Sequence, residues 1–160
     1  LRLKRTNMVQ LTRSVYLSFL PIAEEKRVKL SFESVNVPCY ALVDRDRMIQ
    51  GISNLVSNAI KYTPAGGRVV LSVDWTADYT LIACKDNGIG IAEEDQPYVF
   101  NRLYRVDKSR SRFSGGVGIG LSIAKALAEA HHGRITLESK LGEGSTFTVI
   151  VPNELTKMES

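Results

Sequence analysis

The sequence lacks any long hydrophobic run. Its longest strand-like apolar run, Phe147 to Val151, is far shorter than the roughly 18 uninterrupted residues that a membrane span requires. The start of the chain also lacks the charged and then apolar layout of a signal peptide, and the first residue is Leu1 rather than Met. We therefore expect no membrane span here, and we expect the chain to be a piece excised from a longer protein.

Cysteine is scarce as well. The two cysteines, Cys39 and Cys84, have neither the spacing of metal ligands nor a partner motif, which disfavours a disulfide framework and a zinc site. Reduced and buried thiols are typical of cytoplasmic proteins, and we expect both cysteines in that state.

The excess of charge is small. The chain has 21 Lys and Arg against 17 Asp and Glu, and a net charge of +4 suggests weak affinity for nucleic acid at most. Basic residues nevertheless gather in one short segment, which is either a solvated loop or a segment that faces an anion. The segment contains Arg102, Arg105, Lys108, Arg110 and Arg112.

What the chain does have is the composition of one soluble domain. Its 160 residues, 44% apolar and 24% charged, can form a packed core but leave little room for a second one. Helical spacing of apolar residues predicts helices over 9–23, from the N-cap Asp44 to about Tyr62, and over 119–130. Alternating or β-rich segments predict strands at 28–32, 40–43, 68–75, 79–85, 135–139 and 145–151.

These elements predict an α+β fold. Antiparallel hairpins outnumber any strand-helix-strand crossover in this order of elements. We therefore expect a two-layer α/β sandwich, in which a mixed and mostly antiparallel sheet of about five strands packs on three helices.

A polar row lies on the middle helix. Asn54, Asn58 and Lys61 follow one another at spacings of four and three, which places them on one helix face, apart from the apolar stripe. The row is either solvated or faces a ligand. In the second case an amide oxygen can bind a hard cation such as Mg²⁺, and the lysine can meet a phosphate.

Two glycine clusters flank the basic segment. Asp86-Asn87-Gly88-Ile89-Gly90-Ile91 follows a strand and is either a plain turn or a place where an aspartate accepts a hydrogen bond from an amino group of a flat ligand. Gly115 to Gly120 opens the last helix, where free backbone N–H groups suit a polyphosphate. No ribose-binding acid in a strand-helix-strand unit and no Gly-Lys-Ser or Gly-Lys-Thr occurs, which disfavours dinucleotide-binding and P-loop folds.

The order of these motifs gives a specific resemblance. The sequence closely resembles the catalytic ATP-binding domain of bacterial sensor histidine kinases, which belongs to the GHKL-type superfamily shared with gyrase, Hsp90 and MutL. The resemblance covers residues 11–152. Its motifs are an N box (Asn54 to Tyr62), a first glycine box (Asp86 to Gly90), an F box (Phe100 to Arg105), a second glycine box (Gly116 to Gly120) and a terminal Gly-x-Gly-x-Thr element (Gly142 to Phe147).

For the fold, the resemblance implies a Bergerat-type ATP-binding domain. Residues 1–160 would form one domain. Residues 1–8 would be the remnant of a linker from an absent dimerisation and phosphoacceptor domain, and residues 153–160 would be a C-terminal tail.

For the site, the resemblance implies Mg-ATP as the ligand. Asn58 would be the side-chain ligand of Mg²⁺, with Asn54 supporting the metal or its waters, and Lys61 and Tyr62 would line the nucleotide site. Asp86 would bind the adenine amino group.

Further roles are implied around the adenine and the phosphates. Gly90 and, through water, Thr146 would assist Asp86. Residues 100–116 would form a lid, in which Arg105 meets the triphosphate, and Gly118 and Gly120 would let backbone amides reach the phosphates. The other residues expected at the nucleotide are Gly88, Ile91, Phe100, Tyr104, Gly116, Val117, Ile119 and Leu121.

Position 54 bears on the activity. The gyrase, Hsp90 and MutL branches have a glutamate base there, whereas Asn54 cannot take a proton at neutral pH. The resemblance therefore implies a histidine autokinase, in which the γ-phosphate is presented to a histidine on a separate domain and Asn54, Asn58, Lys61 and Arg105 act on the transfer. The two histidines of this chain, His131 and His132, end a helix and are expected to be structural.

The expected partners follow from the same resemblance. They are ATP, the dimerisation and phosphoacceptor domain of the same parent, and a response regulator, with no nucleic acid. The fragment would be a monomeric cytoplasmic domain, and its parent a homodimer anchored in the bacterial membrane. Two alternatives stay open: a serine kinase of the anti-sigma-factor type, and a nucleotide-sensing interaction module with vestigial ATP binding.

Overall fold

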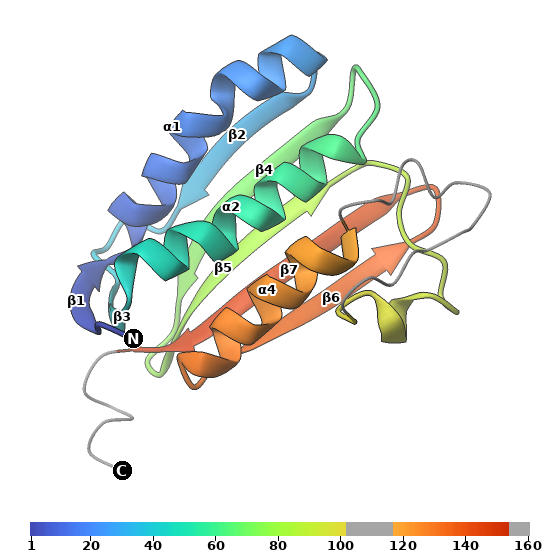
Figure 1. Ribbon diagram of the computed structural model, residues 1–160. Coiled ribbons are helices and arrows are strands. Elements are labelled where there is room, and N and C mark those ends of the chain that lie inside the picture. The colour runs from blue at the N-terminus through green and yellow to red at the C-terminus, as the bar shows by residue number, and fades with distance from the viewer. Residues whose placement is uncertain (102–116, 154–160) are drawn as a thin grey trace.

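The structure is a computed structural model that describes residues 1–101 and 117–153. Within these residues, three α-helices cover one face of a five-stranded sheet (Figure 1). The helices are α1 (Met8–Lys26), α2 (Arg45–Lys61) and α4 (Val117–Ala130). The strands are β2 (Lys29–Ser34), β4 (Arg68–Trp75), β5 (Tyr79–Asp86), β6 (Arg134–Lys140) and β7 (Gly144–Pro152).

The strand order is β2-β4-β5-β7-β6. β2 runs parallel to β4, and the other three neighbouring pairs are antiparallel. The predicted two-layer sandwich, with its mixed and mostly antiparallel sheet on three helices, is therefore confirmed. The turn η1 (Gln96–Tyr98) lies between β5 and the residues that the structure does not describe.

A small second sheet was not predicted in full. β3 (Tyr40–Val43) pairs antiparallel with β1 (Lys4–Asn7) rather than with the main sheet. Asn7 then caps α1, because its side-chain oxygen accepts hydrogen bonds from the backbone N–H groups of Val9 and Gln10. Met8 is fully buried. Residues 4–8, which the sequence suggested to be part of a linker, thus pack into the domain.

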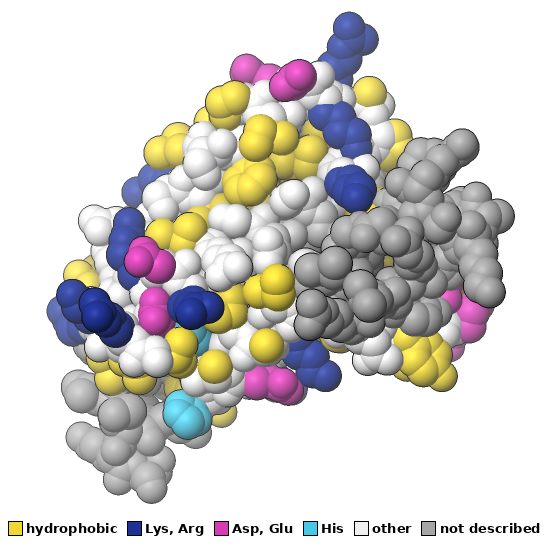
Figure 2. Space-filling view, viewed as in Figure 1, with side chains coloured by type: hydrophobic (Ala, Val, Ile, Leu, Met, Phe, Trp, Pro, Cys, Tyr) yellow, Lys and Arg dark blue, Asp and Glu magenta, His cyan; other side chains and the backbone are white. Residues whose placement is uncertain are grey.

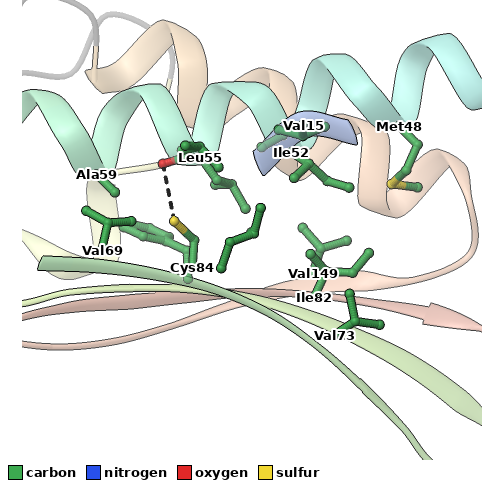
Figure 3. Close-up of a cluster of buried hydrophobic side chains, with 14 of the residues drawn as sticks. Val15, Met48, Ile52, Leu55, Ala59, Val69, Val73, Ile82, Cys84 and Val149 are labelled. Atoms are coloured by element: carbon green, nitrogen blue, oxygen red, sulfur yellow. Dashed lines mark hydrogen bonds between the residues drawn. The ribbon is translucent and has the colours of Figure 1, made fainter. Parts of the chain in front are cut away.

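The apolar core lies between the sheet and the helices (Figure 3). Alternate residues of β4 and β5 point toward the helices, as strand geometry requires, and meet the apolar stripe of α2. Burial of each large side chain contributes on the order of 2 kcal/mol to folding. The core contains Met48, Ile52, Leu55 and Ala59 of α2 and Val69, Leu71, Val73, Ile82 and Cys84 of the strands.

Both cysteines are buried and free, as predicted. The thiol of Cys84 lies 3.8 Å from the carbonyl oxygen of Leu55 (Figure 3). Burial raises the pKa of the Cys84 thiol, so the group stays protonated.

The outer surface of the helices carries charges of both signs, interspersed with apolar side chains (Figure 2). Leu17 and Ile22 of α1 are about half exposed. None of the helices in the described residues is long and apolar enough to cross a membrane.

His131 joins two helix ends. Its Nδ1 lies 2.7 Å from the carbonyl oxygen of Leu127 on α4, and its Nε2 lies 3.0 Å from the backbone nitrogen of Asp44, the N-cap of α2. The carbonyl can only accept and the N–H can only donate, so His131 carries its proton on Nδ1. His132 follows in the left-handed region, at φ 62°, and ends the helix. This geometry supports a structural role for both histidines.

His131→Ala removes both side-chain hydrogen bonds and leaves the part-buried N–H of Asp44 without this partner. We expect the free energy of unfolding to fall by about 2–3 kcal/mol, measured by urea denaturation. His132→Gly is the matched control, because glycine adopts positive φ without strain and should change stability by less than about 0.5 kcal/mol. Equal effects of the two substitutions would contradict the bridging role of His131.

Candidate functional site

The polar row of α2 faces the beginning of α4. Asn54 and Asn58 are half-buried and Lys61 is exposed. The side-chain nitrogen of Asn54 lies 3.5 Å from the carbonyl oxygen of Gly120, and a Cβ on Gly120 would lie 3.9 Å from the Cβ of Asn54. No described residue hydrogen-bonds the amide of Asn58. The row therefore presents amide groups beside a helix start, and it is not simply a solvated face.

Lys26 fixes the C-terminal end of α2. Its ammonium donates to the carbonyl oxygens of Ile60, at 2.6 Å, and Lys61. These carbonyls have no partner within the helix, and a cation at this end also meets the negative pole of the helix dipole. Burial, and then the charge of Lys61, lower the pKa of Lys26. A residue of α1 thus holds the turn from which Lys61 and Tyr62 extend.

The residues after α2 contact the first glycine cluster. Thr63 Oγ1 donates to Ala59 O at 2.7 Å, and the carbonyl of Tyr62 accepts the N–H of Ile89 at 3.2 Å. A Cβ on Gly88 would overlap the Tyr62 carbonyl. Glycine is therefore required at position 88 for the two segments to lie side by side.

Asp86 ends β5 and is 8% exposed. Its Oδ1 accepts the backbone N–H groups of Gly88 at 2.9 Å and Ser145 at 3.2 Å. No described residue hydrogen-bonds Oδ2. Burial raises the pKa of Asp86, and the two N–H groups partly oppose this shift. The arrangement is a buried carboxylate with one oxygen fixed by the backbone and the other able to accept a hydrogen bond from a ligand.

The β6–β7 turn packs behind Asp86. A Cβ on Gly144 would overlap the Asp86 carbonyl, and a Cβ on Gly90, which has φ 71°, would overlap the Lys140 carbonyl. The residues after α2, the loop after β5 and the β6–β7 turn are distant in sequence, and their backbones therefore come into contact around the carboxylate of Asp86. This close approach explains why glycine occupies positions 88, 90 and 144. It also excludes the alternative that residues 86–91 form a plain turn.

The residue of β7 that donates a hydrogen bond to the Asp86 carboxylate is Ser145 rather than Thr146. Thr146 pairs with Lys85, which lies on the opposite face of the sheet from Asp86, and side chains alternate along a strand. The structure therefore does not bring the Thr146 side chain to the carboxylate. Sequence reasoning missed Ser145, and it also missed Ser139 and Gln96, which hold the adjoining loop.

Phe100, the first residue of the F box, packs edge-on against Phe147, with ring centres 5.9 Å apart. Lys125 of α4 lies 5.8 Å from the centre of the Phe100 ring, so residues of β7 and α4 both contact this side chain. Ile91 and Leu121 belong to the buried core. Tyr104, Arg105 and Gly116 lie outside the described residues, as does the whole basic segment.

α4 begins at the second glycine box. Its helical backbone starts at Val117 and includes Gly118, Ile119 and Gly120. The start of a helix presents free N–H groups and the positive end of its dipole, which suits an anionic group. Because Asn54 lies against Gly120, the two features form one continuous site.

A family model decides the identity of this arrangement. The model for histidine kinase-, DNA gyrase B-, and HSP90-like ATPases matches residues 43–155, from the end of β3 through β7. The chain belongs to this family. Asn54, Asn58, Asp86 and both glycine clusters all lie inside the matched region.

Similar sequences are sensor histidine kinases. The chain is 41% identical over 134 residues to sensor histidine kinase RppB of Synechocystis sp. The matched region covers 84% of this chain and 30% of RppB. It is 39% identical over 148 residues to sensor histidine kinase WalK of Bacillus subtilis. This matched region covers 90% of this chain and 24% of WalK. The chain thus spans less than a third of the length of these relatives.

Similar solved structures are histidine kinases as well. The catalytic domain of histidine kinase ThkA, at 26% identity, superposes with a TM-score of 0.83 over 96% of this chain and 99% of that domain. Full-length ShkA in complex with AMPPNP, at 27% identity, gives 0.83 over 96% of this chain and 31% of ShkA. ThkA in complex with response regulator protein TrrA, at 25% identity, gives 0.79 over 94% of this chain and 42% of that ThkA chain.

These comparisons confirm the predicted family, the Bergerat-type fold and the likeness to histidine-kinase catalytic domains. They also favour this interpretation over the anti-sigma-factor kinase and the vestigial module. Membership of an ATPase family makes ATP the ligand class of this domain.

The substitution Asp86→Asn should change thermal stability and ATP affinity in opposite directions. Folding raises the pKa of Asp86, so the carboxyl favours the folded state when protonated, at acid pH, and this contribution is lost as the pH rises through the folded-state pKa. Asparagine is neutral and keeps the oxygen that accepts the two N–H groups. We expect the variant to be more stable than the wild type at pH 7 by thermal melting, and equally stable below about pH 4.

The resemblance implies that Asp86 binds the adenine amino group, and in that case the same substitution places an NH₂ group opposite it. We expect ATP affinity to fall about 100-fold by calorimetric titration, because two donors then face each other. A variant that is less stable at pH 7, or that binds ATP as tightly as the wild type, would contradict the role given to Asp86.

Proposed function

We propose that this chain is the catalytic domain of a sensor histidine kinase, which binds Mg-ATP and presents the γ-phosphate to a histidine on a separate dimerisation and phosphoacceptor domain. The observation that carries the proposal is Asp86, a buried carboxylate whose Oδ1 is held by two backbone N–H groups. The complex of ShkA with AMPPNP supports a nucleotide in the same fold.

Adenine recognition rests on the free oxygen of Asp86. An exocyclic amino group is a donor, and a carboxylate oxygen is an acceptor with no proton of its own at neutral pH. Gly88 and Gly90 let the loop after Asp86 pack against the carbonyls of Tyr62 and Lys140, and Oδ2 of Asp86 has no hydrogen-bond partner among the described residues, so we propose that a flat base meets this oxygen edge-on. A keto group at the same place would meet repulsion, which gives the site a preference for adenine.

Asn58 is the proposed metal ligand. Mg²⁺ prefers oxygen ligands, keeps several waters and is commonly completed by substrate phosphates. Among the described residues no three His, Cys, Asp or Glu side chains form a metal site, whereas the amide of Asn58 has no hydrogen-bond partner there. The donor set fits a cation held by one amide oxygen together with phosphates. The ion would neutralise charge on the phosphates, Asn54 would hold its waters and Lys61 would add positive charge.

The proposed nucleophile is a histidine on a separate domain. Asn54 occupies the place of a general base and cannot accept a proton, so hydrolysis lacks its catalyst. Catalysis is then positioning and charge stabilisation, in which the bond from the γ-phosphorus to the bridging oxygen breaks, a bond to an imidazole nitrogen forms and ADP leaves. His131 cannot serve, because it is buried and both its ring nitrogens are hydrogen-bonded.

The remaining roles concern the whole protein. Tyr104, Arg105 and the basic segment are proposed to meet the triphosphate as part of a lid, with Gly116 and Gly118 beside the phosphates. ThkA has been crystallised with the response regulator TrrA, which supports a response regulator as the downstream partner. We further propose that the parent is a membrane-anchored homodimer and that this domain is cytoplasmic and monomeric alone.

Asn58→Ala tests the metal role. The variant removes one amide oxygen, so we expect affinity for ATP in the presence of Mg²⁺ to fall about 10- to 100-fold, while affinity measured in EDTA is unchanged. Calorimetric titration of both conditions gives the comparison. Gln50→Ala, which removes an exposed amide from the same helix, should alter neither value. A loss of affinity that is independent of Mg²⁺ would exclude Asn58 as a ligand.

The chain alone should not phosphorylate itself. After incubation with γ-labelled ATP and Mg²⁺ we expect no acid-labile label on this domain, because its histidines are structural. The full parent protein under the same conditions should become labelled on a histidine outside this chain. Stable label on His131 or His132 would refute the proposal.

A further inference from the structure

We propose that Ser139 is a positioning residue for adenine recognition, because its hydroxyl joins the β7 turn that fixes Asp86 to the loop that follows Asp86. The inference rests on the proposed ATP binding and deepens it. Ser139 lies on β6, more than fifty positions from Asp86 along the chain, and no motif of the sequence includes it.

The hydroxyl of Ser139 makes three contacts. It lies 3.0 Å from the carbonyl oxygen of Gly144, 2.8 Å from Ser145 Oγ and 2.8 Å from the backbone nitrogen of Ile91. The carbonyl can only accept, so the hydroxyl hydrogen of Ser139 goes to Gly144. Ser145 and Ile91 then donate to the two lone pairs of Ser139, and the hydroxyl is saturated.

The first connection runs to the carboxylate. Ser145 gives its hydroxyl to Ser139 and its backbone N–H to Asp86 Oδ1, at 3.2 Å. Gly144, which receives the hydrogen of Ser139, lies in backbone contact with Asp86. Ser139 therefore holds both residues of β7 that contact Asp86, including the one whose N–H fixes Oδ1.

The second connection runs to the loop. The N–H of Ile91 binds Ser139, and the carbonyl of Ile91 accepts from Gln96 Nε2 at 2.9 Å. The other hydrogen of Gln96 goes to the carbonyl of Ser139, at 3.0 Å. Both peptide groups of Ile91 are thus fastened to β6 by side chains. The loop from Asp86 to Ile91 is consequently fixed at its start by the carboxylate and at its end by Ser139.

The charged side chains on the elements around Asp86 are placed so that the hydrogen bonds of this network can influence its pKa. Lys85 of β5 and Arg68 of β4 lie on the opposite face of the sheet, Lys61 of α2 is exposed, and the contacting residue of β7 is uncharged. Cys84 shares the face of Asp86, and burial raises the pKa of its thiol, so it stays neutral. The backbone N–H groups of Gly88 and Ser145 are therefore the local interactions that stabilise the charged form.

The experiment compares ATP with inosine triphosphate, which has a carbonyl oxygen in place of the adenine amino group. In Ser139→Ala we expect ATP affinity to fall about five- to twenty-fold and inosine triphosphate affinity to change less than about two-fold, so that the preference for ATP shrinks. Ser139→Thr retains the hydroxyl and should restore the preference. Ser72→Ala, a half-buried serine of β4 away from the site, is the matched control.

A second readout does not depend on nucleotide. In Ser139→Ala the N–H of Ser145 is less firmly held, so we expect the pKa of Asp86, followed by NMR of its carboxyl carbon, to rise further, whereas Ser72→Ala leaves it unchanged. If Ser139→Ala does not fold, Ser139→Cys keeps the volume with a much weaker hydrogen-bonding group and takes its place.

The outcomes separate this inference from the proposed function. A wild-type domain that binds neither nucleotide would refute the proposed function, while a shifted Asp86 titration would still support the positioning role. A wild-type domain that prefers ATP, together with a Ser139→Ala variant that keeps the same preference and the same Asp86 titration, would overturn the inference alone. An equal loss of affinity for ATP and inosine triphosphate in Ser139→Ala, together with a lower melting temperature, would show that Ser139 has a structural role only. That result would also overturn the inference.

Discussion

The site depends on keeping one carboxylate charged inside a largely apolar domain. Burial disfavours the charged form of Asp86, and in the part of the chain that the structure describes two backbone N–H groups, rather than a counter-ion, oppose this. Such donors work only at hydrogen-bond distance, so the end of β5, the loop after it and the start of β7 must meet without intervening side chains. The glycines at 88, 90 and 144 and the hydroxyl of Ser139 all serve that approach.

On the other side of the site, contacts with α1 and α4 hold α2 in position. α2 is fixed at one end by His131, which links it to α4, and at the other by Lys26, which links it to α1. The polar row of α2 lies between these two anchors. Asn54 and Asn58 can therefore be poor helix formers without loosening the helix, because contacts from two other helices hold its ends.

Much of this could be predicted from the sequence, and the reason is local. Apolar periodicity placed all three helices, and strand patterns placed the five strands of the main sheet to within a residue or two at most ends, because these signals depend on neighbouring residues. β1 was missed, since Lys4–Asn7 has no apolar alternation and is fixed by pairing with β3. Ser139 and Gln96 were missed because the contacts that tie β6 to the loop, Ser139 with Ile91 and Gln96 with Ser139, join residues 48 and 43 positions apart. Thr146 was chosen in place of Ser145 because a shift of one residue reverses the face of a strand, which a motif alone does not reveal.

The pairing of β5 with β7 also bears on how the domain is made. Asp86 and the Ser145 N–H that holds it are 59 positions apart, and the later of the two lies on the last strand of the chain's sheet. During synthesis from the N-terminus, α1, α2, β4 and β5 emerge from the ribosome before β7 exists. The nascent domain therefore carries Asp86 with only one of its two backbone donors, and the second is added only when β7 is inserted between β5 and β6.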